Sequence, residues 1–280
     1  MSQPQSRPSA SLDALASLFA PGPIAVLTGA GISTDSGIPD YRGAGAPPRN
    51  PMSISQFMRD EAYRRRFWAG ARIGYLRTAN IAPNSGHLAL ANLEAAGRID
   101  GVITQNVDDL HRRGGSRTVV ELHGNGAVIR CVDCDHRSTR GEVLDRFDEL
   151  NPNFVERNSE AEIAPDGDAV VRDADRVEVP RCAVCGGLLR PDVVYFGETV
   201  PPTVFAAAER LIEHATALLL AGTSLAVNTG VRLVHRAERR GIPIAVINRG
   251  PTSIDARESV RIRIEGGTSE TLTALEEVLA

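Results

Sequence analysis

Lysine is absent from the 280-residue sequence, so all 31 of its basic residues are arginine. The 35 acidic residues outnumber them and leave a formal net charge of −4. A chain with this charge and no basic run is not expected to bind nucleic acid by bulk electrostatic attraction. Charged residues make up 24% and hydrophobic residues 42% of the chain, as in ordinary globular proteins, so global disorder is not expected.

Long apolar runs are missing too. The longest apolar stretches have the length of a strand or a short helix, so the sequence predicts no membrane-spanning helix and no membrane partner. The Ser- and Pro-rich N-terminus lacks the cationic start and apolar core of a secretory signal. We therefore expect a cytoplasmic protein of bacterial type, with an organelle matrix as the less favoured location. Four cysteines are too few for a disulfide scaffold of this size.

Short apolar runs alternate with helical patterns along the chain. The first run, 23–28, leads directly into glycines, which is typical of a strand buried on both faces of a parallel sheet. Strands that alternate with helices predict a doubly wound α/β sheet. The other expected strands lie at 101–104, 119–122, 217–221, 242–247 and 260–264, and the expected helices at 85–96, 203–214, 228–240 and 269–279.

Two stretches do not fit this alternation. Residues 44–79 contain an Arg- and aromatic-rich helical pattern, and residues 125–185 carry the cysteines and a polar middle part. We predict that both are insertions that form a smaller second domain. The sheet domain would then consist of residues 1–43, 80–124 and 186–280.

The glycines after the first strand suggest a phosphate-binding loop. Gly29 and Gly31 allow a tight turn and a close backbone approach to a diphosphate, and the start of a following helix would offer free N–H groups. Thr34 stands where the dinucleotide-binding pattern has its third glycine. Taken alone, the loop fits a nucleotide site and a plain turn equally well.

Polar residues at further strand ends favour the nucleotide site. In open parallel sheets, ligands bind at the carboxyl ends of the strands. Any one of these residues could be a helix cap or turn former, but four groups together are hard to explain in that way. They are the loop 36–43 with Asp40, Tyr41 and Arg42, the run Gln105-Asn106-Val107-Asp108, the run Gly222-Thr223-Ser224, and Asn248.

Two CxxC pairs predict a metal site. Cys131 and Cys134 form the first pair and Cys182 and Cys185 the second, and each pair places two thiolates at a spacing suited to a tetrahedral ion. Four cysteine ligands close the coordination shell, so the spacing predicts one structural Zn²⁺. Redox dithiols and two disulfides are the competing interpretations, and a redox CxxC does not ordinarily come in a pair.

His123 is a candidate general base. It lies at the end of an expected strand beside a glycine, and an imidazole with an ordinary pKa near ~6.5 can accept a proton at physiological pH. A lone histidine is as often a hydrogen-bonded structural residue. His87 and His111 compete for the role, but both fall in helical patterns, so we interpret them as structural.

Together these motifs resemble those of the sirtuins, which are NAD-dependent protein-lysine deacylases. The chain is similar to their class II branch, to which the mitochondrial sirtuin four belongs. The matching segments run in family order from residue 24 to about residue 250. They include 29–42, Thr104–Asp108, Leu122–Gly124, both CxxC pairs, Arg190–Glu198, Gly222–Leu225 and Val246–Asn248, and the branch assignment depends on Leu150–Pro152, Ala164–Asp168 and Asn248–Thr252.

The resemblance implies a Rossmann-like NAD-binding domain with a smaller zinc domain, and a role for each matching residue. Asn106 and Asp108 would line the nicotinamide pocket. His123 and Asn106 would be the catalytic residues, with His123 as the base. The substrate peptide would pair as an added strand with Val193, Val194, Tyr195, Phe196, Gly197 and Glu198. NAD would be bound by Gly29, Ala30, Gly31, Ile32, Ser33, Thr34, Asp40, Tyr41, Arg42, Gln105, Asn106, Val107, Asp108, Gly222, Thr223, Ser224, Asn248, Arg249 and Gly250.

The resemblance also implies that NAD is consumed. The acyl-lysine oxygen attacks C1′ of the nicotinamide ribose and nicotinamide leaves. His123 then activates a ribose hydroxyl that attacks the resulting imidate, and water releases lysine and O-acyl-ADP-ribose. Tyr63 and Arg66 have the spacing of the residues that recognise succinyl groups in one branch, but their surroundings do not match, so the acyl group stays open. Alternatives are a mono-ADP-ribosyltransferase, a non-catalytic NAD sensor and a hydride-transferring enzyme, the last of which leaves the CxxC pairs unexplained. We expect a monomer that acts on acylated lysine side chains of other proteins.

The missing lysines acquire a meaning in this light. A high-GC genome explains the preference for arginine over lysine, and that is the simplest account. A lysine deacylase without lysine nevertheless has no side-chain amine on which to carry the acyl mark that it removes.

Overall fold

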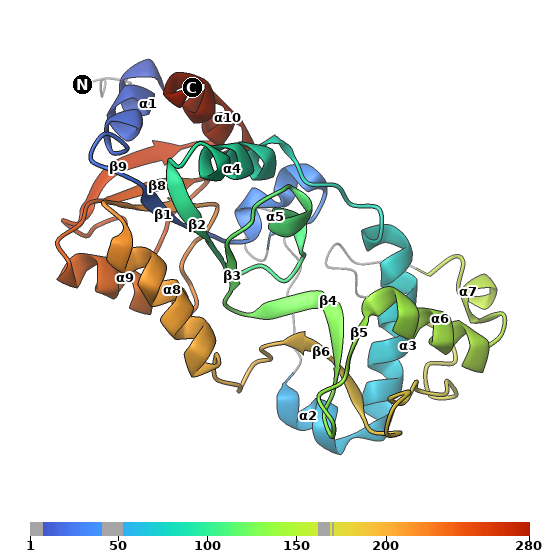
Figure 1. Ribbon diagram of the computed structural model, residues 1–280. Coiled ribbons are helices and arrows are strands. Elements are labelled where there is room, and N and C mark those ends of the chain that lie inside the picture. The colour runs from blue at the N-terminus through green and yellow to red at the C-terminus, as the bar shows by residue number, and fades with distance from the viewer. Residues whose placement is uncertain (1–7, 41–52, 162–168, 170) are drawn as a thin grey trace.

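The computed structural model describes residues 8–40, 53–161, 169 and 171–280. It shows a large parallel sheet covered by helices and a smaller unit built around a three-stranded sheet (Figure 1). The sequence motifs fall on both units, and Tyr41, Arg42 and 164–168 lie outside the described residues. Among the residues that are described, no helix is both long and apolar enough to span a bilayer.

The large sheet has six parallel strands in the order β3-β2-β1-β7-β8-β9. The chain builds outward from β1 to β3 on one side and from β7 to β9 on the other. The order therefore reverses between β1 and β7, the place where such sheets bind ligands. The strands are β1 (Ile24–Thr28), β2 (Ile99–Thr104), β3 (Val119–Glu121), β7 (Leu218–Ala221), β8 (Ile244–Asn248) and β9 (Val260–Glu265).

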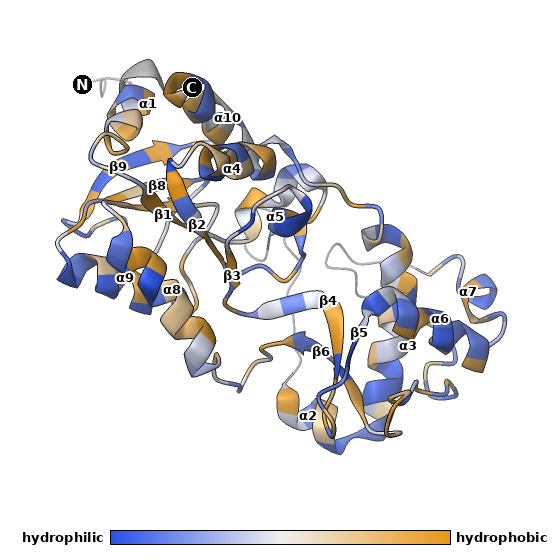
Figure 2. Ribbon diagram, viewed as in Figure 1, coloured by the Kyte–Doolittle hydropathy of each residue, from blue (hydrophilic) through white to orange (hydrophobic). Residues whose placement is uncertain are grey.

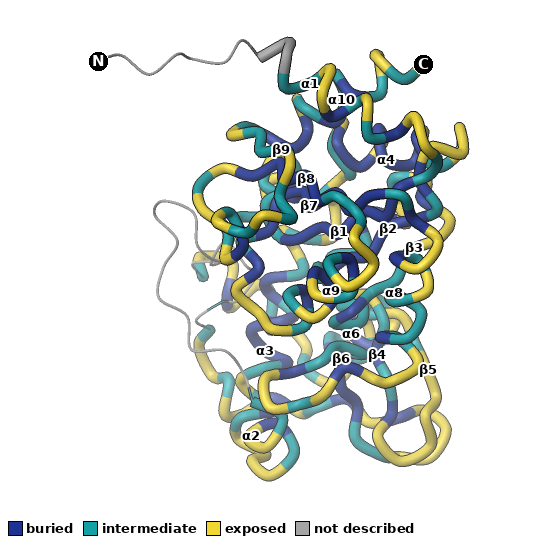
Figure 3. The backbone as a smooth tube through the Cα atoms, turned by 90° about the vertical axis from the view of Figure 1, so that its left-hand side faces the viewer, coloured by how far each residue is buried: buried dark blue, intermediate teal, exposed yellow. Residues whose placement is uncertain are grey.

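Helices cover both faces of this sheet because its central strands are apolar on both faces. All five residues of β1 are buried. Alternate residues pack in two separate cores, so that Leu27 meets α8 and α9 while Val26 meets α1, α4 and α10. Figure 2 shows the apolar strands, and Figure 3 shows them as the buried centre of the unit. The helices are α1 (Pro8–Ser17), α4 (Ser85–Ala95), α8 (Pro202–His214), α9 (Asn228–Arg239) and α10 (Thr268–Leu279).

The smaller unit packs its antiparallel sheet, in the order β5-β4-β6, against helices. Trp68, Phe147 and Phe154 are fully or almost fully buried in its core. Thr139 and Glu142 form a capping box that fixes the start of α6. The elements are β4 (Gly124–Cys131), β5 (Arg137–Thr139), β6 (Leu189–Val193), α2 (Ile54–Arg59), α3 (Glu61–Thr78), α6 (Arg140–Leu150) and α7 (Phe154–Arg157).

The expected α/β sheet is confirmed, and the expected strands and helices of the large unit end within two residues of the observed ones. The small sheet was not expected. Its strand β6 lies within residues 186–280, which were predicted to belong to the sheet domain, yet it pairs with β4 of the small unit. β4 begins with Gly-Asn-Gly and β6 contains Arg190 and Pro191, so neither shows the apolar pattern on which strand prediction depends.

Candidate active site

The glycine loop after β1 packs backbone to backbone against the loop after β7. Residues Ala30–Ile32 form a 3₁₀ turn in place of the expected helix start, and the Gly31 N–H donates to the Gly222 carbonyl at 2.8 Å. A Cβ added to Gly31 would lie 2.8 Å from the Gly222 Cα. Gly222 has a φ of +64°, and a Cβ there would lie 2.4 Å from the Ile32 nitrogen. These glycines therefore let the two loops meet at the point where the strand order reverses.

The run after β2 joins these loops through its side chains. Asn106 Nδ2 donates to the Gly29 carbonyl and to Ser33 Oγ, both at 3.1 Å. Ser33 Oγ donates in turn to the Asp108 carboxylate at 2.7 Å. Gln105 Nε2 donates to Thr223 Oγ1 at 2.8 Å. Residues predicted at three strand ends thus form one hydrogen-bonded cluster.

The fourth strand end completes the same edge of the sheet. Asn248 is 7% exposed at the end of β8, and its Nδ2 donates to the carbonyls of Arg249 and Gly250 at 3.0 and 2.9 Å. The Gly222 N–H donates to the carbonyl of Ile247, one residue before Asn248. Asn248 thus shapes its own loop beside the Gly222 loop. Ser224 lies in the loop after β7, where its carbonyl accepts the Ser253 N–H at 3.1 Å.

Four polar strand ends next to a glycine loop fit the parts of NAD. The loops at the reversal point suit a diphosphate, and the amides and hydroxyls of Gln105, Asn106, Ser33 and Thr223 suit sugar and amide groups. Asp40 is half-buried and is the last described residue before the gap at 41–52, so the predicted contacts of Tyr41 and Arg42 lie outside the described chain.

His123 lies directly beyond β3, next to this cluster. Its Nδ1 is 2.9 Å from the Gln105 carbonyl oxygen, an acceptor that requires Nδ1 to carry the proton. In the part of the chain that the structure describes, Nδ1 makes the one hydrogen bond of the ring, and Nε2 makes none. Burial lowers the pKa of His123, and the hydrogen bond to Gln105 opposes this shift. A neutral imidazole with a free Nε2 lone pair is ready to accept a proton.

His87 and His111 lie on helices, as their sequence patterns predicted. Both are almost fully buried, on α4 and on the short helix α5 (Leu110–Arg113), with ring centroids 4.8 Å apart. His111 Nε2 is 2.8 Å from Thr28 Oγ1, which donates to Thr104 Oγ1, and that hydroxyl accepts the Asn106 N–H. Burial lowers the pKa of His87 to about 4 and that of His111 to about 3. Both rings are therefore neutral at physiological pH, and His111 is linked to Asn106 through the hydroxyls of Thr28 and Thr104.

Asn84 and Thr268 are site residues that the sequence analysis missed. Asn84 Nδ2 donates to the Ile32 carbonyl at 2.8 Å, while its Oδ1 caps α4. Thr268 Oγ1 donates to the Gly31 carbonyl at 3.3 Å from the start of α10. An Asn before a helical pattern signals an N-cap, so Asn84 was identifiable as a cap. Its second contact crosses 52 residues and leaves no local pattern.

The predicted peptide-binding segment runs from the end of β6 past His123. The Val194 N–H donates to the His123 carbonyl at 2.8 Å, and the Phe196 carbonyl accepts the Ile54 N–H at 3.3 Å. The Phe196 side chain is 59% exposed, whereas Tyr195 is buried. The Glu198 carboxylate is bound by the Arg190 guanidinium, so Glu198 could offer a peptide its backbone rather than its charge.

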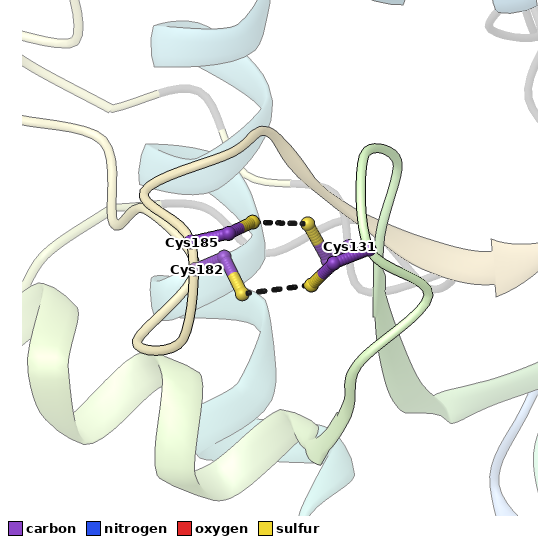
Figure 4. A group of neighbouring side chains, drawn as sticks. Cys131, Cys182 and Cys185 are labelled. Atoms are coloured by element: carbon purple, nitrogen blue, oxygen red, sulfur yellow. Dashed lines mark hydrogen bonds between the residues drawn. The ribbon is translucent and has the colours of Figure 1, made fainter.

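The four cysteines converge as their spacing predicted. Cys131 and Cys185 Sγ atoms lie 3.5 Å apart, Cys134 and Cys182 Sγ atoms lie 3.7 Å apart, and all four fall within 4.8 Å of one another (Figure 4). Zn–S bonds of about 2.3 Å in a tetrahedron place sulfurs roughly 3.8 Å apart, so the cluster fits a Cys₄ zinc site. This ion would join the β4–β5 turn to the segment before β6 and leave no position open for catalysis.

The sequence and the fold are both similar to those of known proteins. The model of the Sir2 family matches residues 29–229. NAD-dependent protein deacetylase 1 of Mycobacterium avium is 50% identical over 92% of this chain and 92% of its own length. NAD-dependent protein deacylase SIR4 of Monosiga brevicollis is 42% identical over 83% of this chain and 77% of its own. A solved Sir2 structure described with a p53 peptide and NAD⁺ is 32% identical, with a TM-score of 0.75, over 95% of this chain and 98% of that one.

Proposed function

Since the chain belongs to the Sir2 family, we propose that it removes acyl groups from protein lysines with NAD as co-substrate, at the edge where β1, β2, β3 and β7 end. The observation that carries the proposal is the convergence of the Gly29–Ser33 loop, Asn106, Asp108 and His123 at that edge. NAD supplies the electrophilic ribose carbon, water is the third reactant, and the products are lysine, nicotinamide and O-acyl-ADP-ribose.

The chain's residues hold the co-substrate in a fixed order along the sheet. The Gly29–Thr34 loop faces the diphosphate, and Asn106, Val107 and Asp108 surround the nicotinamide end. Gln105 contacts a ribose, while Gly222–Ser224 and Asn248–Gly250 hold the adenosine half. The network from Asn106 through Ser33 to Asp108 supports this assignment, because it orients these groups before any ligand arrives.

His123 serves as the general base. Gln105 fixes the Nδ1–H tautomer, which leaves Nε2 to accept a proton from a ribose hydroxyl as that hydroxyl attacks the acyl carbon. The lowered pKa keeps the ring neutral at physiological pH. The acylated peptide docks along 193–198. The Val194 N–H of this segment donates to the carbonyl of His123, so a backbone hydrogen bond links the docking segment to the base.

A panel of peptides with different acyl-lysines, incubated with NAD and followed by mass spectrometry, tests the proposal and finds the preferred acyl group. We expect one acyl class to be removed with one nicotinamide released per lysine. ADP-ribose transferred to protein with every acyl peptide left intact would favour the transferase, and NAD binding without nicotinamide release would favour a sensor. We also propose that the protein is a cytoplasmic monomer. Light scattering after size-exclusion chromatography tests whether it is a monomer in solution.

A further inference from the structure

We propose that Arg190 and Glu198 are a positioning pair that sets the shape of the peptide-docking segment 193–198, and thereby the affinity for the acylated peptide. This inference rests on the proposed function, because it concerns the same site. Neither side chain is assigned to NAD, and neither is expected to touch the reacting atoms.

The pair closes the docking segment into a turn. Arg190 leaves β6 with a side chain only 7% exposed, and its two terminal nitrogens donate to the two Glu198 carboxylate oxygens at 2.7 and 2.6 Å. One of those nitrogens also donates to the Val193 carbonyl, and the Glu198 carboxylate accepts the Tyr195 N–H at 2.9 Å. This bidentate ion pair thus fixes the Val193 carbonyl and the Tyr195 N–H inside the turn that it spans.

Burial and charge indicate that the pair is ionised. Burial raises the pKa of Glu198, but hydrogen bonds from Arg190 and from the Tyr195 N–H, together with the guanidinium charge, outweigh it, so that the net pKa is lowered. Removal of either partner of such a pair destabilises the surrounding structure, because the remaining charge is left buried and unpaired.

The turn decides which side chains of the segment face outward. The Arg190 guanidinium lies 4.7 Å from the centre of the Tyr195 ring, and that ring packs 5.7 Å from Phe57 of α2. With Tyr195 held inward, its neighbour Phe196 is exposed and its carbonyl reaches Ile54. Val194, on the other side, is bonded to His123. A loosened turn would no longer hold the peptide-facing backbone in one conformation before the peptide arrives, so the peptide would bind more weakly.

The test compares Glu198→Gln and Arg190→Lys with Glu238→Gln. Gln keeps the shape of Glu without its charge, and Lys keeps the charge of Arg without its two-pronged geometry. Glu238 is the matched control, because it forms a similar half-buried pair with Arg257 at 2.9 Å on the large unit, away from the docking segment. A fluorescent acetyl-lysine peptide measures peptide affinity by anisotropy, nicotinamide release gives kcat and the KM for NAD, and zinc content and Tm report on folding.

We expect both pair variants to weaken peptide binding at least about tenfold, the loss of one charge-assisted hydrogen bond. Their KM for NAD, their zinc content and their kcat at saturating peptide should stay within about twofold of the parent, and the control should bind peptide normally. Unchanged peptide affinity in Glu198→Gln, or a parallel loss of NAD affinity and zinc, would overturn the positioning role. A parent protein that binds the peptide without turnover would instead count against the proposed function and leave the affinity comparison intact.

Discussion

The Nδ1 atom of His123 lies 2.9 Å from the carbonyl oxygen of Gln105, so the residue proposed to hold a ribose also fixes the tautomer of the proposed base. A backbone carbonyl cannot be protonated or removed by ordinary substitution. The arrangement therefore presents Nε2 as the acceptor whatever the pH, provided that the ring is neutral.

The pH dependence of kcat/KM should report this base. Burial lowers the pKa of His123 below its ordinary value of 6.5, and a base is active when it is deprotonated. Activity should therefore rise with pH, reach half its maximum below pH 6.5 and stay level through pH 7. A midpoint above pH 7 in a pH–rate profile would contradict the assignment.

The buried pair His87 and His111 should make the protein sensitive to acid. Their folded-state pKa values, about 4 and about 3, lie below the unfolded value near 6.5. Their neutral forms therefore contribute fully above pH 6.5, and stability is lost as the pH falls below it. The free energy of unfolding should drop by up to about 1.4 kcal/mol per pH unit for each histidine.

Urea unfolding at pH 7, 6 and 5 measures that slope. His111→Gln should flatten it, whereas His235→Gln, which changes an exposed histidine on α9, should leave it unchanged. Equal slopes in the parent and in His111→Gln would show that other groups cause the acid sensitivity.

Gly222→Ala should disrupt the contact between the two nucleotide loops. Gly222 and Gly241 have nearly the same φ, +64° and +67°, but only Gly222 has backbone atoms where a Cβ would lie. Both variants carry the left-handed strain, so the difference isolates the clash, which should cost about 1–3 kcal/mol more at Gly222. Thermal unfolding and NAD titration of the two variants check this. Equal stability and equal NAD affinity would argue against the packing role of this glycine.

Removal of the metal should unfold the small unit. The four thiols are expected to hold one Zn²⁺ per chain, and in such closed sites metal binding is part of the folding free energy. Chelation or Cys182→Ser should release the metal and abolish activity together. Val184→Ala, on the exposed tip of the same knuckle, should retain both. Full activity in metal-free protein would contradict a structural role.

The lysine-free composition predicts resistance to acylation. With all 31 basic residues arginine, treatment with acetyl phosphate or an acyl-CoA should modify at most the N-terminal amine. Intact-protein mass spectrometry measures this directly, and several added acyl groups would refute it.

Local chemistry explains which features could be predicted from sequence. The zinc ligands were identifiable because a CxxC pair brings its two thiols together within one turn. The strand β1 was identifiable because all five of its residues are apolar or small and buried. Polar residues at the strand ends then predicted a candidate site at one edge of the sheet without any knowledge of strand order.

Features that depend on distant partners could not be predicted. Arg190 and Glu198 are eight positions apart across a turn, and nothing in their spacing distinguishes them from surface charges. Thr268 contacts Gly31 across 237 residues. The pairing of β4 with β6 joins segments on either side of the cysteine insertion, and it depends on the fold of that insertion as a whole.

The most direct test of the account is the release of free lysine by His123→Ala beside the parent protein, with NAD and the best acyl-lysine peptide from the panel. Zinc content and NAD affinity serve as controls for folding. We predict that the parent releases nicotinamide and deacylates the peptide in equal amounts, whereas the variant binds NAD and zinc normally but forms no free lysine. Deacylation at the parent rate by His123→Ala would contradict the central claim.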